Sequence, residues 1–218
     1  MSDLDNRRPI AARDTGFARR VARLLAGAGV SANAISAASV AFAVLAAAAI
    51  LSAPATGPVL WVATAAFIGL RLLANLFDGM VAVEHGKATT SGPIWNELPD
   101  RVSDVLILAA AGYSAAAMLP GAASLAIALG WICAVAAVLT AYVRELGRAL
   151  DTPADFGGPF AKQQRMTTIA AACVISVVEP VWGGRGEVLL AALALTAAGT
   201  LLTAALRTRR LAARLGEK

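Results

Sequence analysis

The chain has 218 residues, of which 58% are hydrophobic and 15% charged, and its mean hydropathy is +0.69. A soluble domain carries charge on roughly a quarter of its residues, so this composition argues against a soluble fold, and the long apolar blocks favour a helical bundle that spans a bilayer. The formal net charge of +5 does not indicate nucleic acid as a partner, because the arginines cluster beside apolar segments, as is typical of chains held at an anionic membrane surface.

The first 32 residues form a polar N-terminal segment that we place in the cytoplasm. Residues 1–15 are polar, and the next stretch, GFARRVARLLAGAG, has the spacing of a short amphipathic helix on the membrane surface. Its apolar face is formed by Phe17, Val21, Leu24 and Leu25. An ordinary solvated helix is the alternative reading. Ser31 or Asn33 is expected to cap the helix that follows.

Six apolar segments follow, and they predict an all-α bundle of six transmembrane helices. The predicted spans are residues 34–51, 59–83, 93–118, 122–150, 166–178 and 188–206. We assign residues 33–210 to this single transmembrane domain and residues 211–218 to a cytoplasmic tail. The two cysteines, Cys133 and Cys173, both lie in apolar runs and are expected to be buried packing residues.

The distribution of charge across these spans predicts their orientation. Lysines and arginines gather on one side of the six spans, whereas the turns on the other side contain only Arg185. By the positive-inside rule, both termini face the cytoplasm, and the protein is expected in the cytoplasmic (inner) membrane with many passes through the lipid bilayer.

Two neighbouring spans carry polar residues at helical spacing. One stripe consists of Arg71, Asn75, Asp78 and Ala82, and a second consists of Asn96, Asp100 and Asp104, with Glu97 three positions before Asp100. Ionisable groups inside a membrane segment are costly and usually mark a site, and carboxylates are ligands for a cation that holds a phosphate-bearing substrate. A structural ion-pair network with Arg71 and Arg101 is the alternative.

This region also resembles a known family. The chain reads NLFDGMVAV from Asn75 to Val83 and, after residues 84–91, GPIWNELPD from Gly92 to Asp100. The pattern is similar to the signature of the CDP-alcohol phosphatidyltransferases, D-x-x-D-G-x-x-A-R followed by G-x-x-x-D-x-x-x-D. Asn75 and Asn96 replace two aspartates, and Val83 replaces the arginine. The stretches GVSANAIS, AYVRELGRAL and AKQQR also resemble the family, so the likeness covers most of the chain.

The resemblance implies roles for particular residues. Asp78 and Asp100 are the expected catalytic residues, and Asp100 would take the proton of the acceptor hydroxyl. The expected ligands of Mg2+ or Mn2+ at the signature positions are Asn75, Asp78, Asn96 and Asp100. Because two of these positions have lost a negative charge, Glu97 and Asp104 are expected as replacement acids. The expected contacts to the CDP group are Gly79, Ala82 and Gly92, with Lys87 or Arg101 as a replacement for the arginine that is lost at Val83. Arg144, Lys162 and Arg165 are candidates for binding a phosphate or carboxylate of the acceptor, or are simply positive residues at the lipid headgroups.

The resemblance therefore implies a membrane enzyme of phospholipid synthesis. The 33–210 domain would be catalytic and would transfer a phosphatidyl or other phosphoalcohol group from CDP-diacylglycerol or a similar CDP-alcohol to an alcohol, releasing CMP. The family also implies a homodimer. The altered signature leaves a second hypothesis open, in which the chain is a catalytically inactive membrane homologue that binds lipid or nucleotide.

Overall fold

The computed structural model describes residues 15–84 and 90–217, and these ranges are all-helical, with no strand. The α-helices are α1 (Gly16–Gly27), α2 (Ala32–Thr56), α3 (Pro58–Glu84), α4 (Gly92–Met118), α5 (Ala123–Ala149), α6 (Lys162–Ser176) and α7 (Glu187–Gly216). Two short 3-10 helices, η2 (Pro120–Ala122) and η3 (Glu179–Trp182), lie in the connections. The all-α prediction is therefore confirmed for the described residues.

The long helices begin and end close to the predicted positions, for local reasons that the sequence carries. The Ser31 hydroxyl accepts a hydrogen bond from Ala34 N at 3.2 Å, so Ser31 is the N-cap of α2. The helix runs to Thr56, through Pro54, and ends at Gly57, where φ is 101°. Such a positive φ is readily adopted by glycine, and it lets the chain reverse directly into α3.

Five helices are long and apolar enough to cross a membrane, namely α2, α3 up to Ala82, α4, the η2–α5 segment and α7. The fifth predicted span, residues 166–178, corresponds to α6, which has 15 residues. At 1.5 Å per residue it is about 22 Å long, shorter than the roughly 30 Å hydrocarbon core. The prediction of six full spans is therefore not confirmed.

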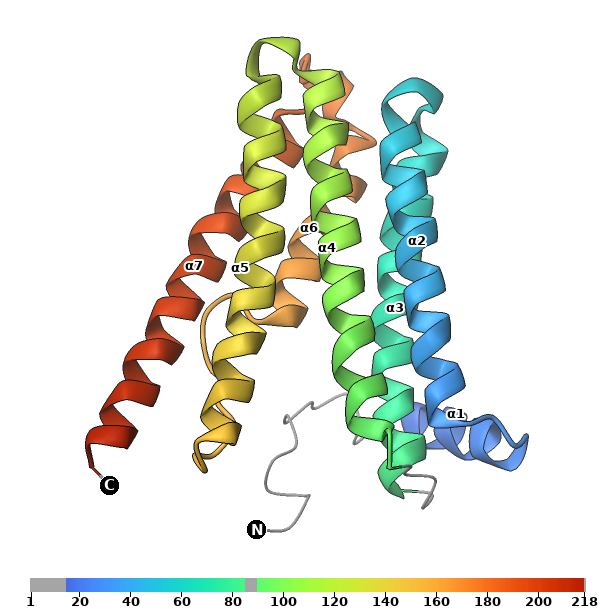
Figure 1. Ribbon diagram of the computed structural model, residues 1–218. Coiled ribbons are helices and arrows are strands. Elements are labelled where there is room, and N and C mark those ends of the chain that lie inside the picture. Colours follow the sequence, from blue (N-terminus) through green and yellow to red (C-terminus); the bar gives the residue numbers. More distant parts are fainter. Residues whose placement is uncertain (1–14, 85–89, 218) are drawn as a thin grey trace.

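The helices pair side by side along the length of the molecule (Figure 1). Helix α2 packs on α3 and α4, α4 packs on α5, and α5 packs on α7, while α6 lies among α3 and α7. Buried alanines dominate the central core, and small residues let helices approach closely. At the crossing of α4 and α5, a Cβ on Gly130 would lie 2.8 Å from the Gly112 Cα.

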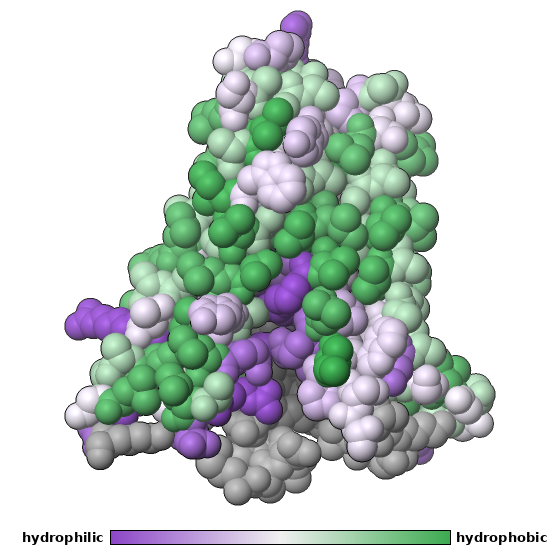
Figure 2. All heavy atoms as spheres, in the orientation of Figure 1, coloured by the Kyte–Doolittle hydropathy of each residue, from purple (hydrophilic) through white to green (hydrophobic). Residues whose placement is uncertain are grey.

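The outer surface of the bundle is apolar over most of its height (Figure 2). Large hydrophobic side chains such as Val135 and Leu139 on α5 are exposed there. This arrangement, with small residues inside and large apolar residues outside, is typical of a bundle whose solvent is lipid.

Helix α1 lies at the same end of the molecule as the C-terminal end of α7 (Figure 1). The Thr15 hydroxyl caps it by accepting from Ala18 N at 3.2 Å. Ala18 and Ala22 are buried against the lower part of α2 and α3, whereas Phe17 and Leu24 are exposed. A helix is therefore present at this position, and its amphipathic character and its placement on a membrane surface stay predictions.

The connection from α5 to α6 positions the site described below. Residues 150–161 are not helical, and α6 begins only part of the way along the bundle (Figure 1). Within this connection, Phe160 N donates to the Thr203 hydroxyl of α7 at 2.9 Å, and the Arg207 Nε donates to Gly157 O at 2.9 Å. Irregular backbone is tolerated at membrane depth only when protein satisfies it in this way. The connection thus delivers the first residue of α6, Lys162, into the interior.

Candidate functional site

The two predicted polar stripes face each other where α3, α4 and α6 meet. Arg71 and Asp78 on α3 and Asp100 and Asp104 on α4 are all buried, and Asn75 is partly buried. Their spacing of three or four residues puts each set on one face of its helix, as the sequence predicts. The two stripes and the start of α6 together form the candidate site.

Asp100 is the centre of this site. Its Oδ1 accepts from Arg71 Nη2 at 3.3 Å and from Asn75 Nδ2 at 3.1 Å. Its Oδ2 accepts from the Lys162 ammonium and lies 3.6 Å from Arg101 Nη2. The same ammonium donates to Asn75 Oδ1. Lys162 therefore lies where a cation shared by Asn75 and Asp100 would lie.

Asp104 lies one turn further into α4 and is fully buried between two arginines. Its Oδ1 is 2.8 Å from Arg71 Nη2, and its Oδ2 is 2.9 Å from Arg165 Nη2. Arg165 is also held by Phe160 O and by the Thr140 hydroxyl of α5. A buried carboxylate is tolerated only when paired, and here both oxygens are engaged. Asp104 thus ties α3, α4 and α6 together.

Asp78 differs from the other two aspartates. Its Oδ2 accepts from the Ser36 hydroxyl of α2 at 2.8 Å, and its Oδ1 is buried with no hydrogen-bond partner among the described residues. An unsatisfied buried carboxylate oxygen is costly, and it marks a position prepared for a proton or a cation. Ser36 was not predicted as a site residue, and its only signal was that it is one of two hydroxyls, with Ser39, in the apolar span 34–51.

Glu97 points away from these aspartates. Its carboxylate pairs with the Arg144 guanidinium of α5, which also contacts Glu145 Oε1 at 2.8 Å and lies over the Phe156 ring at 5.2 Å. A helix places Glu97 about 100° around from Asn96, and this rotation carries it towards α5. The structure therefore does not bring Glu97 to Asp78 and Asp100.

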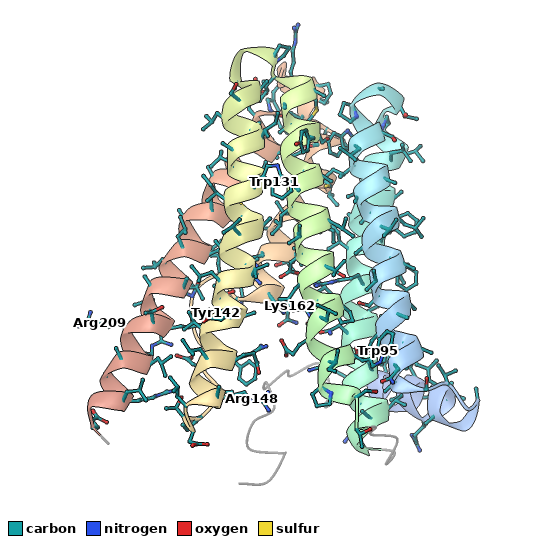
Figure 3. All side chains as sticks on the ribbon, viewed as in Figure 1. Trp95, Trp131, Tyr142, Arg148, Lys162 and Arg209 are labelled. Atoms are coloured by element: carbon teal, nitrogen blue, oxygen red, sulfur yellow. The ribbon has the colours of Figure 1, made fainter. Side chains whose placement is uncertain are left out.

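The remaining predicted residues lie around this centre. Asn96 is exposed near the start of α4, and Gly79 and Ala82 follow Asp78 towards the end of α3. Gly92 and Arg101 lie on α4, and Lys87 lies outside the described residues. The side chain of Lys162 lies between α4 and α5 in Figure 3, and hydrophilic atoms reach the surface at the same place in Figure 2.

The donor atoms fit one hard divalent cation better than several. Among the described residues, no group of three or more His, Cys, Asp or Glu could hold a metal ion. The physical reason is that the arginines enclose Asp104 and Arg144 holds Glu97. The free Asp78 Oδ1 remains, with Asn75 Oδ1 and Asp100 Oδ2 once Lys162 releases them, and such oxygens suit Mg2+ or Mn2+.

Comparisons with known proteins agree with this fold. No protein-family model matches the chain. The inner membrane protein YnbA of Escherichia coli is 27% identical over 153 residues, which are 70% of this chain and 71% of that protein.

Among solved structures, the fold is similar to phosphatidylinositol phosphate synthase (PgsA1) of Mycobacterium tuberculosis. Its complex with manganese and citrate has a TM-score of 0.72 and 18% identity, over 89% of this chain and 88% of that chain. The structure with CDP-DAG bound has a TM-score of 0.72 and 19% identity, over 90% of this chain and 94% of that chain. The apo form has a TM-score of 0.66 and 20% identity, over 87% of this chain and 93% of that chain. At these identities the likeness shows the fold.

Proposed function

We propose that this chain transfers a phosphatidyl or other phosphoalcohol group from a CDP-linked donor to an alcohol acceptor in phospholipid synthesis, with release of CMP. The observation that carries the proposal is the meeting of Asn75, Asp78 and Asp100 inside an apolar bundle, at the spacing of the family signature. The fold likeness to a synthase with CDP-DAG bound supports it.

The reaction needs an activated hydroxyl and a stabilised diphosphate. The acceptor oxygen bonds to the phosphorus that carries the alcohol group, and the bond from this phosphorus to the bridging oxygen breaks. CMP leaves with the electrons of that bond, and the hydroxyl proton passes to Asp100, whose Oδ2 faces the start of α6. In the bound state, Mg2+ or Mn2+ would neutralise the diphosphate.

The protein supplies the remaining parts of the site. Asp78 Oδ1, Asn75 Oδ1 and Asp100 Oδ2 would hold the cation, and Gly79 leaves room beside Asp78 for close approach of the CDP group. We place Ala82, Gly92, Lys87 and Arg101 on the CDP side. Arg144, Lys162 and Arg165 lie on the α5 and α6 side, from which we expect the acceptor to approach.

The proposal includes a location. The end of the bundle that carries α1 and the C-terminal end of α7 faces the cytoplasm, where a CDP-linked donor is made available, and the chain lies in the inner membrane. A relative is named as an inner membrane protein, which supports this placement. A homodimer stays a prediction from the family resemblance.

A second candidate is an inactive homologue that binds lipid or nucleotide. The observation that favours it is the Lys162 ammonium, which already contacts Asn75 and Asp100. An ammonium at that position competes with a divalent cation for the same oxygens.

Turnover separates the two candidates. Purified protein is incubated with CDP-diacylglycerol, Mn2+ or Mg2+ and a panel of alcohols, and CMP is measured. We expect metal-dependent CMP release that Asp78→Ala and Asp100→Ala abolish. Glu217→Gln is the control, because Glu217 is an exposed carboxylate at the end of α7. Binding of CDP-diacylglycerol without CMP release from any alcohol would establish the second candidate.

A further inference from the structure

The charges around Arg144 bear on which acceptor the site takes. Resting on the proposed function, we infer that the acceptor alcohol carries no anionic group, so that an unphosphorylated hydroxyl compound is the substrate and its phosphate ester is not. Two observations support this inference. The carboxylates Glu97 and Glu145 neutralise Arg144, and every other cation described at the centre of the site is also paired with a carboxylate.

Arg144 is the first cation to consider, because it lies on α5 and pairs with Glu97, three residues before Asp100 on α4. Its guanidinium contacts two carboxylates, Glu97 from α4 and Glu145 from its own helix. Only 11% of its side chain is exposed, and Phe156 covers one face of the guanidinium. A phosphate could reach Arg144 only by displacing one of these carboxylates. The displaced carboxylate would then lie next to the incoming anion, and like charges repel.

The two cations on α6 are engaged in the same way. Arg165 is 1% exposed and is held by Asp104, by Phe160 O and by the Thr140 hydroxyl. Moving Arg165 to a ligand would leave Asp104 buried with one partner fewer, which is strongly unfavourable. Lys162 donates to Asn75 and Asp100 in the metal-free site. The proposed divalent cation would release Lys162, but its two positive charges would be balanced by the two negative charges of the CDP diphosphate, so the charge balance of the site would not change.

A count of charges leads to the same conclusion. Five cations and five carboxylates gather here, and each of the cations lies within ion-pair distance of a carboxylate. They are Arg71, Arg101, Arg144, Lys162 and Arg165, with Asp78, Glu97, Asp100, Asp104 and Glu145. A further cation, Arg148, shares Glu145, and its side chain is 43% exposed, so water and salt screen it. These five cations are therefore matched by five carboxylates, and the nearby buried Arg207 is held by the carbonyl oxygens of Thr140 and Gly157, so an anionic acceptor would have to break existing contacts.

A neutral alcohol can bind without an unpaired cation in the site. It requires hydrogen bonds to its hydroxyl groups, which carboxylates and the Asn75 amide can provide without breaking an ion pair. A site built from paired charges discriminates against an additional unpaired anion, because that anion would be desolvated without a partner.

The test compares alcohols with their own phosphate esters. Wild-type protein receives CDP-diacylglycerol, Mn2+ and either glycerol or glycerol 3-phosphate, and in a second pair either inositol or inositol 1-phosphate. We expect kcat/KM for the free alcohol to exceed that for the ester by about tenfold or more in the pair that turns over. Preference for the ester would overturn the inference.

Freeing Arg144 should change the preference in a graded way. The Glu97→Gln/Glu145→Gln variant should shift the ratio towards the ester by about tenfold or more. Glu145→Gln alone keeps Arg144 paired with Glu97 and should give a smaller shift. Glu217→Gln, which changes an exposed carboxylate at the end of α7, is the matched control and should leave the ratio unchanged. Equal ratios in all variants would contradict the inference.

Binding without turnover separates this inference from the proposed function. Titration with inorganic phosphate, followed by calorimetry, should show no saturable binding to the wild type and saturable binding to Glu97→Gln/Glu145→Gln. Saturable phosphate binding to the wild type that Arg144→Gln removes would overturn the inference. If no alcohol releases CMP, the proposed function fails, and the phosphate titration still decides whether Arg144 is available to an anion.

Discussion

Lys162 and Asp100 form an ion pair between the first residue of α6 and the middle of the buried stripe on α4, across 62 residues of sequence. The same ammonium donates to Asn75 on α3. One flexible side chain therefore joins three helices at the point where the proposed cation would bind. Its position makes it a competitor of any divalent cation for these two oxygens.

Removing this competitor should strengthen metal binding. We expect Lys162→Met to raise the affinity for Mn2+ by about tenfold or more, because the variant frees Asn75 Oδ1 and Asp100 Oδ2 and removes a positive charge. The measurement is Mn2+ titration followed by electron paramagnetic resonance. Gln163→Met, an exposed neighbour on α6, is the control. Unchanged affinity would show that Lys162 does not occupy the cation position.

The buried pairs of Asp104 should dominate the stability of the site. Asp104→Asn leaves Arg71 and Arg165 with one carboxylate fewer, and breaking such a buried pair typically costs about 3–5 kcal/mol. Thermal unfolding in detergent should show a large fall in the midpoint. Asp155→Asn should change stability by about 1 kcal/mol or less, because its partner Arg210 is 40% exposed. Similar midpoints for both variants would count against this role of Asp104.

The close approach of α4 and α5 should not tolerate a methyl group. Gly130→Ala would place a Cβ 2.8 Å from the Gly112 Cα and 3.0 Å from Leu108 O, so the helices must separate. We expect a loss of about 1–3 kcal/mol in stability. Gly69→Ala on α3 is the matched control, because a Cβ there meets nothing within 4 Å. Equal stability of the two variants would mean that the crossing can open without cost.

The orientation can be tested by cysteine labelling, since the two native cysteines are free and buried. A membrane-impermeant maleimide applied to intact spheroplasts should label Trp182→Cys in the α6–α7 connection but not Arg209→Cys near the end of α7. Both positions are exposed, and the Arg209 side chain points away from the bundle (Figure 3). The opposite labelling pattern would place the site on the side away from a cytosolic donor.

Much of this fold could be predicted because it depends on local patterns. Hydrophobic blocks and the Ser31 cap predict the helices, and helical spacing predicts that Asn75 and Asp78 share one face of α3, as Asp100 and Asp104 do on α4. These features depend on residues within a few turns of each other. The six-span count is not confirmed: the fifth predicted span, residues 166–178, is already short in the sequence, and α6 begins inside the bundle (Figure 1).

The contacts within the site could not be predicted in the same way. Helical spacing says which face a residue occupies on its own helix, but it does not say which neighbouring helix that face meets. The pairing of Glu97 with Arg144 spans 47 residues, and that of Asp104 with Arg165 spans 61. Glu97 was predicted as a metal ligand from charge balance at the altered signature, and the structure instead turns it towards α5.

The non-helical connection between α5 and α6 also has a consequence for biogenesis. Its backbone forms hydrogen bonds with α7: Phe160 N donates to the Thr203 hydroxyl, and the Arg207 side chain donates to Gly157 O. Helix α7 is synthesised after every other part of the site. Until α7 has been made and inserted, the polar backbone of the connection lacks these hydrogen-bond partners at membrane depth. Lys162 and Arg165 consequently cannot take up their positions until the last helix has entered the bilayer, and insertion of α7 is the step that completes the site.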